Sequence, residues 1–153
     1  MKRIVNLRIV CMYCQLNCEA SEYKYYLETD TNEVFTADEL VKQGLRKLNL
    51  QHDLYKPDYL RLPMIPIMDI AREFCKTPDC LLPFDVTAAD FEEQFEGTLG
   101  HINCDFRYSD PWWNYYGKRV ENMVKEWCNM NNYVYEEGPS FHRMNHPFSR
   151  SAY

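Results

Sequence analysis

The sequence of 153 residues contains little glycine, no long hydrophobic run and no cluster of basic side chains. With only five glycines and no Walker, Gly-x-Ser-x-Gly, His-Glu-x-x-His or Rossmann pattern, it lacks the common phosphate-binding loops and catalytic motifs. No apolar stretch approaches the roughly 20 residues that span a bilayer, so we expect neither a transmembrane helix nor a membrane partner. The first eight residues place Asn6 and Arg8 where a signal peptide needs an unbroken apolar core, which predicts a cytoplasmic protein.

One segment carries the excess negative charge of the chain. The 17 basic and 23 acidic residues give a formal net charge of −6, and residues 85–110 contain seven of the acidic residues but a single basic one, Arg107. Binding to a nucleic-acid backbone needs clustered Lys and Arg. The charge distribution therefore predicts a basic protein as the partner and leaves a small nucleic-acid-associated regulator as an alternative.

The seven cysteines are an odd number, and we expect them to stay reduced in the cytoplasm. Cys11 with Cys14, and Cys75 with Cys80, form two close pairs whose four thiols offer a zinc site. Neither pair lies in a Gly-containing turn, and free cysteine is among the most buried residue types. We interpret these residues as core side chains and expect no metal or cofactor, with a metal- or thiol-dependent enzyme as the alternative.

Local patterns in the first half of the chain predict short elements. Residues 6–18 favour a helix that buries three cysteines, although alternating apolar residues at its start also suit a strand. Residues 23–35 read as a hairpin with turn residues in the middle. Thr36 and Glu39 have the spacing of a capping box and predict a helix with Leu40 and Leu45 on its apolar side.

The second half predicts longer helices. A strand at residues 59–62 is followed by a helix that opens at Pro66. A further helix begins after the start signal at residues 87–90, and its expected apolar side consists of Phe91, Phe95 and Leu99. Asp110 and Pro111 predict the start of a long amphipathic helix, with a short strand at residues 133–135 after it.

Together these patterns predict one α+β domain over residues 1–137, with a small antiparallel sheet packed against about five helices. Residues 138–153 lack periodicity and predict a loosely ordered C-terminal tail.

Four segments resemble the bacterial uncharacterised-protein family number 0158, over about residues 4–135. The first two segments are a short helix and a hairpin with the pattern YYL-turn-x-E-V. The third is a helix with the pattern P-x-x-x-(I/M)-x-x-F. The fourth consists of a Gly, an F-R pair and a Trp-bearing helix that ends with E-W. The matching residues are 25–34, Pro66, Ile70, Phe74, Gly100, Phe106, Arg107, Trp112, Trp113, Glu126 and Trp127.

The resemblance implies a fold and no activity. Members usually show a basic GRGAFRxFK stretch in the fourth segment, where this chain has GHINCDFRYS. A nucleic-acid or phosphate role for that loop is therefore in doubt here.

Aromatic residues are densest at residues 106–116, next to the acidic segment. We expect the long helix to bury Trp113 and Tyr116, which leaves Trp112 and Tyr115 for contacts with a partner; exposed Trp, Tyr and Arg are enriched at interface hot spots. The sequence thus predicts a non-enzymatic, intracellular protein-binding module, such as an inhibitor or immunity-type protein, whose oligomeric state it leaves open. The expected binding residues are Asp90, Glu92, Glu93, Glu96, Asp105, Arg107, Tyr108, Trp112 and Tyr115.

Overall fold

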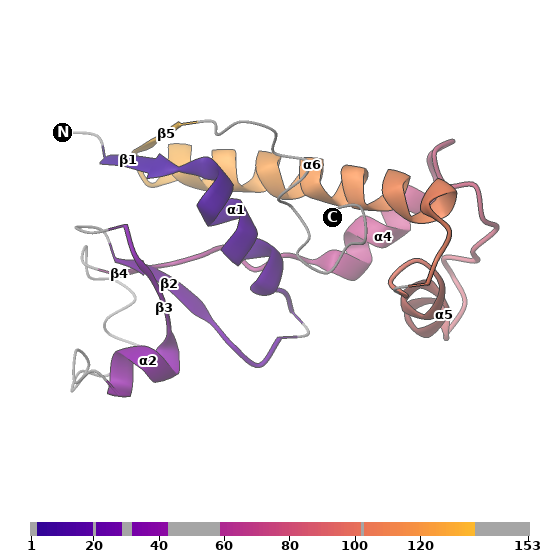
Figure 1. The fold of residues 1–153 in the computed structure, drawn as a ribbon, viewed down its shortest axis with the longest axis horizontal. Helices are drawn as coiled ribbons and strands as arrows, with labels where there is room; N and C mark the ends of the chain where they lie inside the picture. Colours follow the sequence, from indigo (N-terminus) through magenta and orange to yellow (C-terminus); the bar gives the residue numbers. More distant parts are fainter. Residues whose placement is uncertain (1–2, 20, 29–31, 43–58, 102, 137–153) are drawn as a thin grey trace.

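The computed structural model describes residues 3–19, 21–28, 32–42, 59–101 and 103–136. These residues form an α+β fold with five helices and two small sheets (Figure 1). The helices are α1 (Leu7–Leu16), α2 (Ala37–Lys42), α4 (Ile67–Cys75), α5 (Phe91–Thr98) and α6 (Phe106–Met130). The strands are β1 (Arg3–Asn6), β2 (Tyr25–Glu28), β3 (Val34–Thr36), β4 (Tyr59–Arg61) and β5 (Tyr133–Glu136).

The antiparallel sheet has the strand order β3-β2-β4, which confirms the predicted hairpin and the predicted strand near residue 60. A second sheet is a parallel pair of β1 and β5, in which Ile4 lies opposite Val134. The sequence did not predict this pair, because its two strands lie at opposite ends of the described chain. The helix predicted at residues 6–18 is confirmed as α1 with shorter bounds: Asn6 ends β1 and caps the helix, and Asn17 follows its last residue.

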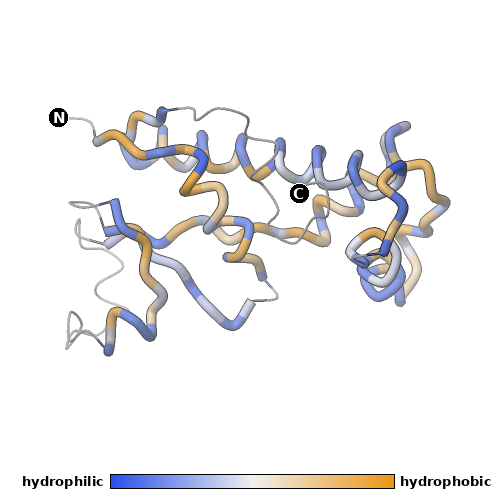
Figure 2. The backbone as a smooth tube through the Cα atoms, viewed as in Figure 1, coloured by the Kyte–Doolittle hydropathy of each residue, from blue (hydrophilic) through white to orange (hydrophobic). Residues whose placement is uncertain are grey.

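Helix α6 organises the core. It runs the length of the molecule, with the β1–β5 pair at its C-terminal end and α5 near its N-terminal end (Figure 1), and both α1 and α4 pack against it. Hydrophilic positions recur with each of its turns (Figure 2), as expected of an amphipathic helix. Its buried side carries Trp112, Tyr116, Val120, Val124 and Cys128, each four residues from the next.

Capping side chains explain where two helices begin. The side chains of Thr36 and Glu39 bond to each other's backbone N–H, at 3.1 and 3.3 Å, which confirms the predicted capping box at the start of α2. Helix α6 begins at Phe106 rather than at Pro111, because Oδ1 of Asp105 accepts from the backbone N of Arg107 at 2.9 Å. The prediction that Asp110 caps this helix was wrong, since Asp105 provides a cap one turn earlier.

Two predictions fall partly or wholly outside the described residues: the C-terminal tail at 138–153 and the Leu45 turn of the second helix. None of the helices in the described ranges is long and apolar enough to cross a membrane.

Candidate functional site

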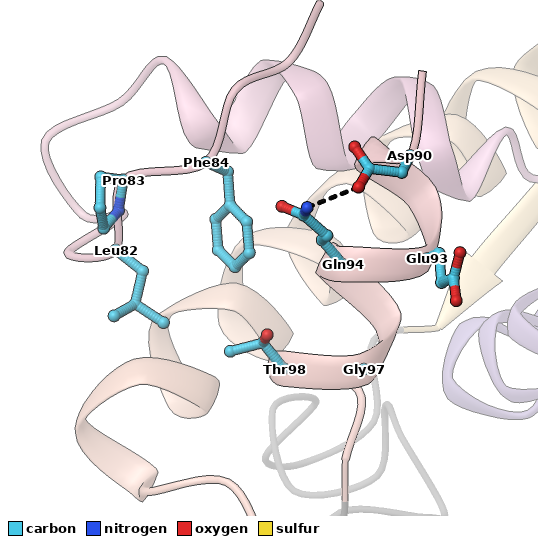
Figure 3. A pocket seen from close by; sticks show the side chains of 8 residues that line it. All are labelled: Leu82, Pro83, Phe84, Asp90, Glu93, Gln94, Gly97 and Thr98. Carbon is cyan, nitrogen blue, oxygen red and sulfur yellow. Dashed lines mark hydrogen bonds between the residues drawn. The ribbon is translucent and has the colours of Figure 1, made fainter. Parts of the chain in front are cut away.

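A groove of about 620 Å³ lies between α5 and the segment 82–84 that precedes it (Figure 3). Apolar side chains from the segment form one wall, and polar side chains from the start and outer side of α5 form the other (Figure 3). The residues that line it are Leu82, Pro83, Phe84, Asp90, Glu93, Gln94, Gly97 and Thr98. We call this feature the α5 groove.

The apolar side of α5 fixes the position of the groove. Phe91, Phe95 and Leu99 are at most 2 % exposed, which confirms the predicted apolar side. The Phe84 ring packs on the rings of Phe91 and Phe95 at centroid distances of 6.3 and 5.3 Å. Because Phe84 anchors the preceding segment to the same aromatic cluster, the apolar residues Leu82–Phe84 lie beside α5.

The space above Gly97 is open. This residue lies inside α5, and a Cβ atom built on it would meet no other atom within 4 Å. Gly97, Gln94 and the apolar segment Leu82–Phe84 were not among the predicted binding residues. The signals that the sequence offers for them are a proline among apolar residues and a glycine within an amphipathic helix.

The carboxylates around α5 differ in what they contact. Within the described residues, Glu93 and Glu96 are exposed and have neither a hydrogen bond nor an ion pair. Asp90 accepts a hydrogen bond of 2.6 Å from the neutral amide of Gln94, which leaves its negative charge uncompensated. Glu92 instead pairs with Arg72 of α4 at 3.3 Å. Of the predicted acidic residues, Asp90 and Glu93 therefore line the groove, Glu96 lies beside it, and Glu92 joins two helices.

A separate group lies at the start of α6. Asp105 caps the helix and pairs with Arg107, whose Nη2 lies 3.0 Å from Oδ2. The hydrogen bond and charge of Asp105 raise the pKa of Arg107. The guanidinium carbon of Arg107 lies 5.6 Å from the centre of the Tyr108 ring. Asp105 and Arg107 are exposed and Tyr108 is half-buried, and none of these three predicted residues lines the groove.

The expectation that the long helix buries Trp113 and leaves Trp112 for contact with a partner was wrong. Trp112 is 1 % exposed and packs edge-on against Phe95, with ring centroids 4.9 Å apart. The helical period alone does not decide which neighbouring tryptophan is buried; the position of α5 and α4 over this end of α6 buries Trp112 and leaves Trp113 half-buried.

Tyr115 is half-buried and has a structural contact. Its hydroxyl donates to Oε2 of Glu73 at 3.3 Å, and Arg119 donates to the same carboxylate at 3.0 Å. Burial and the nearby Glu73 charge raise the pKa of Tyr115. The predicted contact of Tyr115 with a partner would therefore compete with a link between α4 and α6.

The cysteine pairs lie in two different places. Cys11 and Cys14 are fully buried between α1 and α6, next to Cys128. Cys75 and Cys80 lie together at the end of α4, where burial and the neighbouring thiol raise the pKa of Cys75 to about 12. No three His, Cys, Asp or Glu side chains of the described ranges gather into a group that could hold a metal ion. The zinc alternative therefore lacks a four-ligand site among these cysteines.

Comparison with known proteins adds no relative: no family model, no curated protein and no solved structure matches the chain. The resemblance to family number 0158 stays a prediction.

Proposed function

We propose that this protein is a non-enzymatic binding module that holds a basic protein partner in the α5 groove, in the manner of an inhibitor or immunity-type protein. The observation that carries the proposal is the placement of two uncompensated carboxylates, Asp90 and Glu93, along an apolar strip with an open floor at Gly97. Side chains of Lys and Arg combine an aliphatic stem with a cationic end, so they match both walls.

Electrostatics favours the same class of partner. Residues 85–110, which supply the α5 side of the groove, carry a charge equal to the net charge of −6, and a patch of one sign raises the association rate of an oppositely charged protein. The groove is lined by eight residues, whereas a stable interface involves about 20–30 residues on each side. A stable complex therefore needs further contacts. The Asp105–Arg107–Tyr108 unit at the start of α6 offers polar and aromatic surface for the rest of such a contact.

The test compares two variants with equal charge changes. Asp90→Asn with Glu93→Lys alters the groove, whereas Glu22→Lys with Glu126→Gln alters exposed carboxylates elsewhere. The tagged protein and both variants capture proteins from a lysate of the source cells. We expect a basic protein that is retained by the parent and the control variant and lost, by about tenfold or more, with the groove variant.

Retention of the same partner by the groove variant would contradict the proposal, as would a partner that is acidic. Gly97→Leu provides an independent check, because its side chain would occupy the groove without changing any charge. We expect this variant to lose the partner while Gly97→Ala keeps it.

A further inference from the structure

A second pocket lies beside α5, where the helix meets the N-terminal part of α4 and the N-terminal half of α6. Its volume is about 330 Å³, within the range of sites that hold small molecules or single side chains. Aromatic and apolar side chains line it, together with one carboxylate. The lining residues are Ile67, Met68, Phe95, Glu96, Gly100, Trp112 and Trp113. We call it the tryptophan pocket.

We propose that the tryptophan pocket binds the guanidinium group of an arginine side chain from the basic partner. The inference rests on the proposed function for the source of that arginine, and it names the chemical group that the partner must present. The occupant follows from three features of the pocket: its aromatic rings, its single charge and its glycine.

Trp113 provides the ring surface that attracts a flat cation, because it is half-buried, whereas Trp112 and Phe95 are 1 and 2 % exposed and form the buried wall behind it. The ring centroid of Trp113 lies 5.9 Å from that of Trp112, and the two planes are inclined by 44°. Trp is the strongest partner in cation–π contacts, and guanidinium stacks on aromatic rings better than a compact ammonium group does. Arginine therefore fits this lining better than lysine.

The charge selects a cation over a neutral or anionic group. Glu96 is exposed and is the one ionisable residue of the lining, and among the described residues it has no ion pair or hydrogen bond. A purely apolar occupant would desolvate this carboxylate without compensation. A guanidinium group would instead pair with Glu96 while its plane contacts the rings.

Gly100 shapes the wall of the pocket. A Cβ atom at this position would lie 2.9 Å from the backbone oxygen of Glu96. The turn after α5 can therefore approach the backbone of the helix this closely because residue 100 has no side chain.

The pocket and the α5 groove belong to one surface. Glu93 lines the groove and Glu96 lines the pocket, and residues three apart on a helix lie next to each other on its surface. One segment of a basic partner can thus place an arginine in the pocket while further cationic residues follow Asp90 and Glu93.

The test uses a single-residue probe, so no partner is needed. N-acetyl-arginine amide is titrated into the isotope-labelled protein, and the indole N–H signals of Trp112 and Trp113 are followed by NMR. N-acetyl-citrulline amide has nearly the same shape without the charge. For a probe of this size we expect a Kd of about 1 mM and at least a roughly fivefold preference for the arginine compound.

Glu96→Gln removes the charge and keeps the shape of the side chain, and Glu126→Gln is the matched control on an exposed carboxylate of α6. We expect the arginine preference to disappear in Glu96→Gln and to persist in Glu126→Gln. Equal binding of the two compounds to the parent protein overturns the proposal, and so does the absence of shifts at the Trp112 and Trp113 signals at probe saturation.

Each of the two proposals can be contradicted without affecting the other. The groove variant Asp90→Asn/Glu93→Lys leaves every residue of the tryptophan pocket unchanged. If the arginine probe does not bind but this variant still loses the partner, the pocket inference is wrong and the proposed function stands. If the probe binds and the variant keeps the partner, the guanidinium site stands and the acidic groove is wrong.

Discussion

Asn17, directly after α1, connects three parts of the molecule through one fully buried side chain. Its Nδ2 donates to the backbone oxygens of Leu62 and Pro63, at 3.0 and 2.9 Å. Its Oδ1 accepts from the backbone N of Tyr25 at 3.3 Å. The amide thereby satisfies buried backbone groups of β2 and of the chain after β4, which no apolar side chain of similar size can do.

We expect Asn17→Ala to lower the free energy of unfolding by about 3 kcal/mol, because three hydrogen bonds, one buried and two partly buried, are lost at roughly 1 kcal/mol each. Urea denaturation followed by circular dichroism measures this change. Asn122→Ala, an exposed position on α6, is the control and should change the stability by less than about 0.5 kcal/mol. Equal effects of the two substitutions would show that the Asn17 bonds add nothing to stability.

Both binding proposals depend on helix α5, which packs on the rest of the protein through an aromatic cluster and an ion pair. The buried side of the helix carries Phe91 and Phe95. On its outer side, Arg72 of α4 pairs with Glu92 at 3.3 Å and lies 5.2 Å from the Phe91 ring centre. An ion pair this exposed adds about 1 kcal/mol at most, so the aromatic cluster dominates the docking of the helix.

The two glycines near the end of α5 should respond to alanine in opposite directions. Gly97→Ala adds a methyl group in open space within a helix, and we expect a gain of about 0.5 kcal/mol. Gly100→Ala brings a Cβ to 2.9 Å from the Glu96 backbone oxygen, and we expect a loss of about 1 kcal/mol or more. Urea midpoints of the two variants decide the matter: two changes of the same sign would contradict this description of the helix end.

At the scale of the whole molecule, the core between α1 and α6 contains three buried thiols. Cys11, Cys14 and Cys128 are fully buried, and burial raises the pKa of each above its ordinary value of 9.0, that of Cys128 to about 11. Burial disfavours the charged thiolate, so the folded state keeps these protons to a higher pH than the unfolded chain does.

This difference in thiol pKa between the folded and unfolded states predicts that the free energy of unfolding falls at alkaline pH. Below about pH 9 the thiols are protonated in both states, and their contribution to stability is fully present. As the pH rises from 9 toward 11, the unfolded chain loses its thiol protons first, and stability falls by about 1.4 kcal/mol for each unit of pKa difference. Urea midpoints between these pH values measure the slope, which Cys128→Ala should reduce. A midpoint independent of pH in this interval would contradict the prediction.

Local features of the fold were predictable because neighbouring residues decide them. The capping box at Thr36 and Glu39, the apolar side of α5 and the hairpin before α2 all depend on residues at most eleven positions apart. In the candidate site, the carboxylates of α5 were predictable as well, because they follow from the charge and the helical pattern of one short segment. The apolar wall at Leu82–Phe84 was missed, since only packing of Phe84 on Phe91 and Phe95 brings it to the helix.

The sequence by itself determined the α+β class, the placement of the negative charge at residues 85–110 and the amphipathic side of α5. These are properties of composition and of short-range periodicity. The tertiary structure decided the parallel pairing of β1 with β5, the burial of Trp112 in place of Trp113 and the function of Glu92 as a link to α4. Each of those outcomes depends on contacts between distant segments, where several arrangements satisfy the same local pattern and only the packed core selects one.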